Sequence, residues 1–313
     1  MTYSIVARDP MTGALGGAVQ SHYFGVGRFA LWAESGVGVV ATQSIVEVSY
    51  GPYGLDRMRS GMSAEVSLEN LITEDALAAL RQVAMVDRSG EVAVHTGEGC
   101  VGLAGHRLGP QVSAQANMME RDTVWDSMID AYLRADGEDL ATRLLLALEA
   151  AESEGGDVRG SQSAALLIVD AKQQARQWDH RLIDLRVDDS DRPLFELRRL
   201  IAVNHGVDRM VAVLNSDLLY APALDPRSAA LAQAMQDLAV AQQALGDNRE
   251  PSLWSAVLLA KAGLVDEARD HLRWAVETND RWPTFLRSLS SAGVLSSDSP
   301  LLLPLGQERL DLE

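Results

Sequence analysis

The chain has 313 residues, of which 27 are basic and 44 acidic, and its formal net charge is −17. An acidic surface repels phosphate groups, so we expect binding neither to nucleic acid nor to an anionic membrane. The hydrophobic fraction of 47% supports a sizeable core, and the length suits one large domain with a smaller one.

The cysteine and histidine content argues against metal chemistry. Cys100 is the only cysteine, which excludes an intramolecular disulfide and a cysteine-based metal site. The six histidines have no spacing typical of metal ligands, so no metal and no other cofactor are expected. No apolar run is long enough to cross a membrane, and the first residues lack the pattern of a secretory signal. We therefore expect a cytoplasmic protein.

The first two thirds of the chain alternate between strands and helices. Strands are expected at residues 3–8, 14–21, 36–42, 82–87, 91–96, 111–119, 163–170 and 176–184. Helices are expected at residues 55–59, 63–71, 74–80, 120–134, 138–153 and 193–204. Residues 51–54, Gly-Pro-Tyr-Gly, are expected to break the chain. The glycines around His106 predict a loop.

The order of these elements indicates the fold class. Strands occur in hairpins and helices in pairs, which differs from the strand–helix alternation of a parallel sheet and predicts antiparallel sheets covered by helices, an α+β domain. After Pro222 an alanine- and leucine-rich composition predicts helices only. We expect a layered domain at residues 1–220, a helical linker at 221–250 and a small all-α domain at 251–313.

The first residues suggest a nucleophile. Methionine is usually removed before a residue as small as threonine, so the mature chain would begin at Thr2. That residue would carry a hydroxyl and an α-amine whose ordinary pKa is about 7.7–8.0, which can act as the base for the hydroxyl. Threonine is also a frequent second residue and a good strand former, so this segment alone leaves both interpretations open.

Polar residues gather where the apolar strands end. Three such clusters lie at residues 20–22, 42–44 and 160–163, and a fourth lies at residues 115–117. Buried polar groups need partners, so these side chains could satisfy one another. They could equally converge on a cleft and bind an oxyanion and a substrate amide. The sequence does not decide between the two.

Two other motifs carry little weight. Residues 97–102 fit the pattern G-x-G-x-x-G, but glycines and a proline follow instead of a helix, and Glu98 places negative charge where a phosphate would lie. The spacing of Cys100 and His106 does not indicate a nucleophile–base pair.

Several motifs, taken in order, resemble a bacterial family known as domain of unknown function 1028. They lie at residues 1–10, 37–43, 50–55, 95–100 and 159–167. The family is placed among the N-terminal-nucleophile (Ntn) hydrolases, which implies a four-layer αββα sandwich. Residues 252–295 resemble a small helical domain often appended to this family and described as peptidoglycan-binding.

The resemblance implies an amidohydrolase that cleaves a small amide, a ureido compound or a short peptide through Thr2, after removal of Met1. The turn that contains Gln43 and Ser44 would supply an oxyanion N–H. The segment from Asp157 to Ser161 would support the amine. The remaining candidate site residues are Ser21, His22, Asn117, Gln162 and Ser163.

One departure leaves an alternative open. Proteasome-like sites use an aspartate after the second strand and a lysine further on, whereas this chain has Ser21 and His22 there, and its only lysines are Lys172 and Lys261. The alternative is a catalytically silent Ntn fold used for binding or assembly. A third hypothesis, a peptidoglycan-associated protein, conflicts with the missing secretory signal. We expect a homodimer by analogy with other stacked-sheet enzymes.

Overall fold

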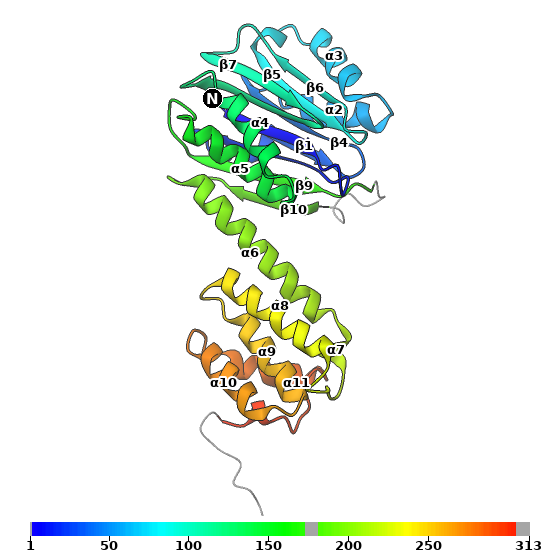
Figure 1. Ribbon diagram of the computed structural model, residues 1–313, viewed down its shortest axis with the longest axis vertical. Helices are drawn as coiled ribbons and strands as arrows, with labels where there is room; N and C mark the ends of the chain where they lie inside the picture. Colours follow the sequence, from blue (N-terminus) through cyan, green and yellow to red (C-terminus); the bar gives the residue numbers. More distant parts are fainter. Residues whose placement is uncertain (1, 173–180, 305–313) are drawn as a thin grey trace, which may run out of the picture. The chain divides into compact units, whose positions relative to one another are not determined.

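The computed structural model describes residues 2–172 and 181–304 (Figure 1). The chain divides into two compact units, Met1–Ile201 and Ala202–Glu313. The division falls inside helix α6 (Pro193–Leu214), before the boundary expected at residue 220. The first unit contains all the strands of the described residues, and the second contains helices.

Within the described residues, the larger sheet of the first unit has six antiparallel strands in the order β10-β9-β2-β1-β8-β7. These strands are β1 (Thr2–Arg8), β2 (Leu15–Ser21), β7 (Leu103–Gly109), β8 (Val112–Met119), β9 (Ser163–Val169) and β10 (Arg181–Val187). Strand β1 therefore lies inside the sheet, paired with β2 on one side and β8 on the other.

A second antiparallel sheet has four strands in the described residues, in the order β3-β4-β5-β6. They are β3 (Leu31–Glu34), β4 (Gly38–Ser44), β5 (Arg81–Asp87) and β6 (Val92–Thr96). The helices of this unit are α1 (Gly27–Ala30), α2 (Tyr50–Arg59), α3 (Ala64–Glu74), α4 (Val124–Arg134) and α5 (Leu140–Ser153), with a 3₁₀ turn at Ala78–Leu80.

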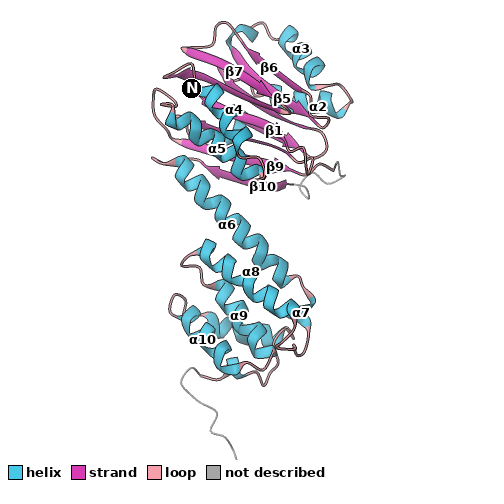
Figure 2. Ribbon diagram, viewed as in Figure 1, coloured by secondary structure: helices cyan, strands magenta, loops and turns pink. Residues whose placement is uncertain are grey.

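The side-chain alternation of the strands builds the layers. On β1, Tyr3, Ile5 and Ala7 belong to the core that contains the residues of α4 and α5. Val6 points to the opposite face and belongs to a core shared by the two sheets. A third core joins the outer face of the smaller sheet to α2 and α3. The two sheets therefore stack, with a helix pair over each outer face (Figure 2).

The expected mixed α+β class is confirmed, but three local predictions are wrong. Residues 51–54 do not break the chain; they lie in α2, where a Cβ on Gly51 would come within 2.3 Å of the Trp32 ring. The glycine-rich segment around His106 is strand β7. The helix expected at residues 74–80 shortens to a 3₁₀ turn.

The second unit is helical, as the sequence predicts. After α6 it comprises α7 (Asp217–Tyr220), α8 (Ala229–Leu245), α9 (Glu250–Lys261), α10 (Val265–Val276), α11 (Trp282–Ser291) and a 3₁₀ turn at Pro300–Leu302. Helix α9 is the centre of its core, because nearly all of its side chains from Pro251 to Leu259 are buried. The residues of α8 belong to this same core.

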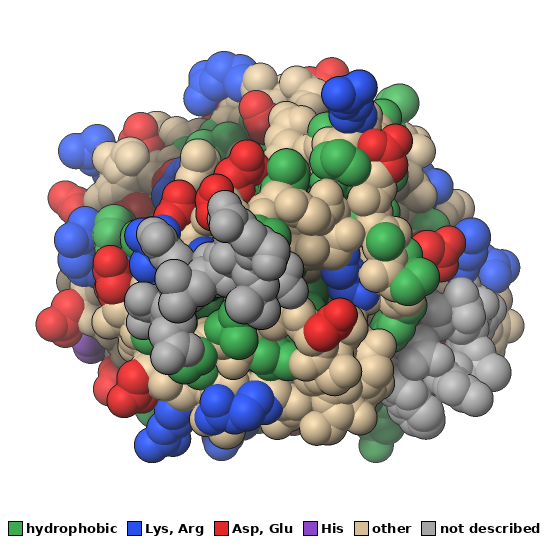
Figure 3. All heavy atoms as spheres, turned by 90° about the horizontal axis from the view of Figure 1, so that it is seen from below, with side chains coloured by type: hydrophobic (Ala, Val, Ile, Leu, Met, Phe, Trp, Pro, Cys, Tyr) green, Lys and Arg blue, Asp and Glu red, His purple; other side chains and the backbone are tan. Residues whose placement is uncertain are grey.

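Over the face that Figure 3 presents, acidic and basic side chains are interspersed and do not gather by sign. None of the helices at residues 2–172 and 181–304 has the length and apolar character needed to cross a bilayer. In the same ranges, no group of three or more His, Cys, Asp or Glu side chains is arranged to hold a metal ion.

Candidate functional site

Thr2 is the first residue of β1 and lies between two neighbouring strands. It pairs with Ser21 at the end of β2 and with Asn117 near the end of β8. Only 7% of the Thr2 residue is exposed. The sheet therefore holds Thr2 by backbone pairing on both sides, at one end of the space between the two sheets.

That end of the inter-sheet space is polar. Successive strand residues point to opposite faces, so the residues that alternate with the helix-facing core point between the sheets. At the end near Thr2, and along the whole of β8, these inward-facing positions are polar and buried, and we call them the polar layer: Thr2, Ser4, Ser21, Gln43, Gln82, Ser113, Gln115, Asn117 and Ser163. At the other end of β1, β4 and β5 they are apolar residues such as Val6, Val39 and Val86.

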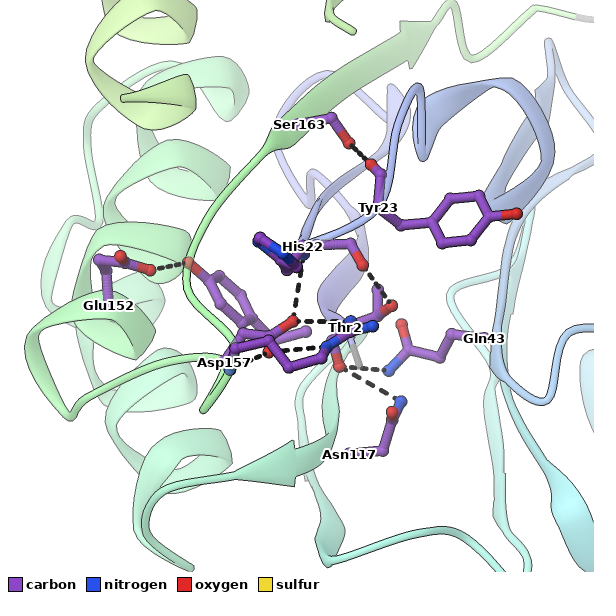
Figure 4. A network of polar contacts seen from close by, with 11 residues as sticks. Thr2, His22, Tyr23, Gln43, Asn117, Glu152, Asp157 and Ser163 are labelled. Atoms are coloured by element: carbon purple, nitrogen blue, oxygen red, sulfur yellow. Dashed lines mark hydrogen bonds and ion pairs between the residues drawn. The ribbon is translucent and has the colours of Figure 1, made fainter. Parts of the chain in front are cut away.

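Two carboxamides hold the backbone carbonyl of Thr2 (Figure 4). Gln43 Nε2 donates to Thr2 O at 3.2 Å, and Asn117 Nδ2 donates to the same oxygen at 3.3 Å. Both amides also donate to Gln82 Oε1, at 2.7 and 3.0 Å. Gln82 thus joins the smaller sheet to the strands that flank Thr2.

The amides of Gln43 and Gln82 are oriented by further bonds. Gln82 Nε2 donates to Thr96 Oγ1 at 2.9 Å and to the carbonyls of Gly105 and Ala116 at 3.1 and 3.0 Å. Gln43 Oε1 accepts from Ser4 Oγ at 2.7 Å. Because the amide nitrogens have carbonyl partners, the orientation of both carboxamides is fixed.

The hydroxyl of Thr2 opens on a cavity of about 110 Å³. Its Oγ1 donates to Ser21 Oγ at 3.1 Å. The cavity is lined by Thr2, Ser21, Tyr23, Val26, Phe29, Ala30, Thr42, Gln43, Ser44 and Val46. A carbonyl group that entered this cavity would lie against the Thr2 hydroxyl. The rest of the wall comes from the two sheets, from α1 and from the loops after β2 and β4.

Ser44 has an unusual backbone at the edge of this cavity. Its φ is 72°, a left-handed conformation that is uncommon for a residue with a side chain. Its Oγ is buried and has no partner among the described residues. A strained residue with an unused hydroxyl beside a cavity is a feature that functional sites often show.

A buried carboxylate fixes the loop that leaves β2. The side chain of Asp157 is 0% exposed, and its Oδ2 accepts from the backbone N–H of His22 at 3.1 Å. Arg159 pairs with the same carboxylate at 3.1 Å. His22 Nδ1 is buried without a partner in the described ranges. In Figure 4, His22 and Asp157 lie on one side of Thr2, and Gln43 and Asn117 lie on the other.

Ser163 and Gln162 lie at the start of β9 and differ in their surroundings. Ser163 Oγ accepts from the backbone N–H of Val26 at 3.0 Å and donates to the carbonyl of Tyr23. Gln162 donates its backbone N–H to Ser21 O at 3.1 Å, while its side chain turns to Asp189 at 3.0 Å. Neither residue lines the cavity, and Ser163 instead holds a segment that does.

The side chains that line the cavity are uncharged. Among the described residues of its wall, none has a side chain that is charged at pH 7. Arg28 is exposed and lines a different cavity. Of the two lysines, Lys172 follows the end of β9 remote from Ser163, and Lys261 belongs to the second unit, where its Nζ donates to the carbonyls of Leu219 and Ala221.

The structure thus brings most of the candidate residues together. Thr2, Ser21, Gln43 and Ser44 line one cavity. Asn117 binds the Thr2 carbonyl and Ser163 holds the segment before α1, whereas the Gln162 side chain turns away to Asp189. The sequence analysis did not identify Gln82, although this residue lies near the start of an apolar strand, as Ser163 does. It also missed the cavity's apolar wall, because that wall depends on how α1 packs.

Comparisons with known proteins identify the family of the chain and a similar solved structure. Residues 2–197 match the model of DUF1028, a family of unknown function. The crystal structure of protein SPO2555 from Silicibacter pomeroyi, itself described with the DUF1028 family model, is similar to this chain, with 31% sequence identity and a TM-score of 0.57. That similarity covers 64% of this chain and 87% of the other. A search among curated proteins finds no match. Because the family model spans more than half of the chain and includes the whole polar layer, this protein belongs to the DUF1028 family.

Proposed function

We propose that the protein is an Ntn-type amidohydrolase in which Thr2, exposed by removal of Met1, attacks a small amide, a ureido compound or a short peptide. The observation that carries the proposal is the position of Thr2, whose carbonyl is held by two carboxamides while its hydroxyl faces a cavity. The stacked sheets between two helix pairs support an assignment to the αββα sandwich of the Ntn hydrolases.

The proposed reaction needs only the chain's own groups and water. The Thr2 α-amine takes the hydroxyl proton as Oγ1 forms a bond to the substrate carbonyl carbon. The carbon–nitrogen bond then breaks, and the proton passes from the α-ammonium to the leaving amine. Water attacks the resulting ester with the α-amine again as base, and the acid leaves as the proton returns to Thr2 Oγ1.

The geometry gives the surrounding residues different roles in this mechanism. The amides of Gln43 and Asn117 already donate to the Thr2 carbonyl, so they position the nucleophile rather than bind the oxyanion. The oxyanion would be stabilised by the turn at Ser44, whose unpartnered Oγ lies at the cavity. Asp157 and His22 fix the loop beside the amine.

The neutral lining of the cavity favours one alternative, a catalytically silent Ntn fold that binds a ligand. Proteasome-like relatives place a lysine at the nucleophile, whereas no lysine, arginine or histidine is among the described residues that line this cavity. The two functions differ in one observable property, because only the enzyme forms a covalent bond between Thr2 and an electrophile.

The test is the intact mass of the protein from near-native expression, before and after exposure to a β-lactone. The enzyme predicts loss of Met1 and a single adduct that peptide mapping places on Thr2. A folded, unlabelled protein that has lost Met1 would favour the silent fold. Retention of Met1 would block the α-amine and contradict the mechanism.

Variants sharpen this test. Thr2→Ala should abolish labelling while the fold persists. Alanine is also small enough for methionine removal, so the variant lacks the hydroxyl and keeps the free α-amine. Thr2→Ser should keep it, because serine supplies the same hydroxyl and amine. Thr73→Ala, which removes an exposed hydroxyl on α3, is the matched control and should label as the wild type does. Labelling of Thr2→Ala at another residue would contradict the assignment.

A further inference from the structure

The cavity at Thr2 has a polar side and an apolar side. The polar side contains the nucleophile with Ser21, Thr42, Gln43 and Ser44, and the apolar side contains Tyr23, Val26, Phe29, Ala30 and Val46. If Thr2 attacks a carbonyl carbon, the acyl group attached to that carbon has to lie within this cavity. The apolar side then determines which acyl groups fit.

The apolar side is firmly built. A Cβ on Gly27 would lie 2.3 Å from Ala165 Cβ, so only glycine lets α1 pack this closely on β9. Ser163 bonds to the backbone of Tyr23 and Val26 and fixes the chain before α1. The rings of Tyr23 and Phe29 meet edge to face with centroids 5.5 Å apart. A wall held in this way keeps its shape when a ligand enters.

Charge and volume restrict the acyl group. The described residues that line the cavity include no lysine, arginine or histidine, and the Thr2 α-amine must be neutral to act as the base. In the reactive protein a carboxylate or phosphate in the cavity would therefore lose hydration without gaining a counter-charge. The volume of about 110 Å³ is below that of an engineered cavity of about 150 Å³ that binds benzene. The space therefore suits an uncharged group of roughly four to six non-hydrogen atoms.

The surroundings of the opening are apolar too. Tyr23 and Phe24 on the loop after β2, and Ile45 and Val46 on the loop after β4, are exposed hydrophobic residues. Each loop contributes a residue to the cavity wall, Tyr23 from the first and Val46 from the second, so apolar side chains border the opening of the cavity.

We propose that the substrate is an amide of a short, uncharged, apolar carboxylic acid, such as a branched aliphatic acid, and that Val46 helps to exclude charged acyl groups. This inference rests on the proposed function. It excludes amides of dicarboxylic acids and of long-chain fatty acids as good substrates.

The experiment compares the rates at which four β-lactones label Thr2, read by intact mass and peptide mapping. One lactone is unsubstituted, and the others carry an isopropyl, a carboxymethyl or a decyl group on the carbon next to the carbonyl. In each case Thr2 Oγ1 bonds to the carbonyl carbon, the ring carbon–oxygen bond breaks, and the hydroxyl proton ends on the released oxygen. The substituent stays in the acyl group and reports on the cavity.

We expect the isopropyl lactone to react at least about tenfold faster than the carboxymethyl and decyl lactones, the smallest factor usual for a misfit in an apolar pocket. Val46→Lys should lower the ratio of the isopropyl labelling rate to the carboxymethyl labelling rate by about tenfold, because the new ammonium supplies a counter-charge. Val46 is 36% exposed, so the lysine can be accommodated without unfolding.

Val48→Lys is the matched control. Val48 is 40% exposed on the same loop but does not line the cavity, so its lysine should leave the preference unchanged. If the unsubstituted lactone labels Thr2 but the carboxymethyl or decyl lactone reacts as fast as the isopropyl one, the substrate class is wrong and the proposed function stands. An equal effect of the two lysine variants would also overturn it. If no lactone labels Thr2, the proposed function fails and the inference fails with it.

Discussion

Gln20 and Gln82 allow one substitution to be compared in two surroundings. Both side chains are wholly buried in strands of the first unit. Gln82 makes five side-chain hydrogen bonds, whereas neither amide atom of Gln20 has a partner in the described residues. Methionine has nearly the shape of glutamine without the amide, so Gln82→Met and Gln20→Met should change the free energy of unfolding in opposite directions.

The magnitudes follow from the partners left behind. Gln82→Met removes the acceptor shared by Gln43 and Asn117, and the donor to Thr96 and two carbonyls. A buried hydrogen bond contributes about 1 kcal/mol and an abandoned partner costs about 1–3 kcal/mol, but Gln43 keeps two carbonyl acceptors. We therefore expect a loss of about 3–5 kcal/mol. Gln20→Met removes two unpaired buried atoms and should be neutral or stabilising by up to about 2 kcal/mol.

Two measurements check this prediction. Guanidinium unfolding gives the overall change, and hydrogen–deuterium exchange of β1 and β8 peptides gives the local one, because a chain with two units need not unfold in a single step. Exchange in the helices of the second unit is the internal control. Equal destabilisation by the two variants would refute the hydrogen-bond argument and leave packing as the explanation.

Three further predictions test other parts of the structure. Asp157→Asn places an amide against backbone N–H groups and should lower the unfolding free energy by about 1–3 kcal/mol in a denaturant titration. Gly51→Ala should cost about 1–3 kcal/mol, because its Cβ would come within 2.3 Å of the rigid Trp32 ring. Gly54→Ala, which meets only a flexible methionine end at 2.8 Å, should cost less. Burial lowers the pKa of His271 below its ordinary value of 6.5. The unfolded chain then binds the proton more readily, so this contribution to stability is complete above pH 6.5 and declines as the pH falls towards the lowered pKa. His271→Gln should flatten that decline in unfolding curves measured across this range.

The sequence predicts the parts of the fold that depend on neighbouring residues. The hairpins of β1 with β2 and of β5 with β6 follow from alternation and turn signals within a few residues. The start of helix α3 is likewise local, because the Ser63 side chain accepts from Val66 N–H. Where the structure differs from the prediction, distant contacts decide. In α2, Gly51 lowers the helix propensity but lets the helix pack closely on Trp32. The segment around His106 is strand β7 because it pairs with β8.

The site was predictable in composition but not in geometry. Polar residues at strand ends pointed to Thr2, Ser21, Gln43, Ser44 and Asn117. That Gln43 and Asn117 bind the Thr2 carbonyl could not be read from the sequence. The contact of Gln43, 41 residues from Thr2, requires the two sheets to stack, and that of Asn117, 115 residues away, requires β8 to pair with β1. The role of Gln82 was hidden for the same reason.

The polar layer is best explained by the need to hold Thr2. Sheet stacking does not require it, because further along β1, β2, β4, β5 and β9 the inward positions are valine, leucine and alanine. Burying amides and hydroxyls gains little over apolar packing, and each must find partners. Here two of the amides have the Thr2 carbonyl as a shared acceptor, and a third joins them. If the fold needed only stability, apolar residues could replace the polar layer. Fixing the first residue of a central strand instead needs directional hydrogen bonds to the backbone of that residue. If the Gln82→Met protein keeps its fold yet reacts with a β-lactone as fast as the wild type, this explanation loses its basis.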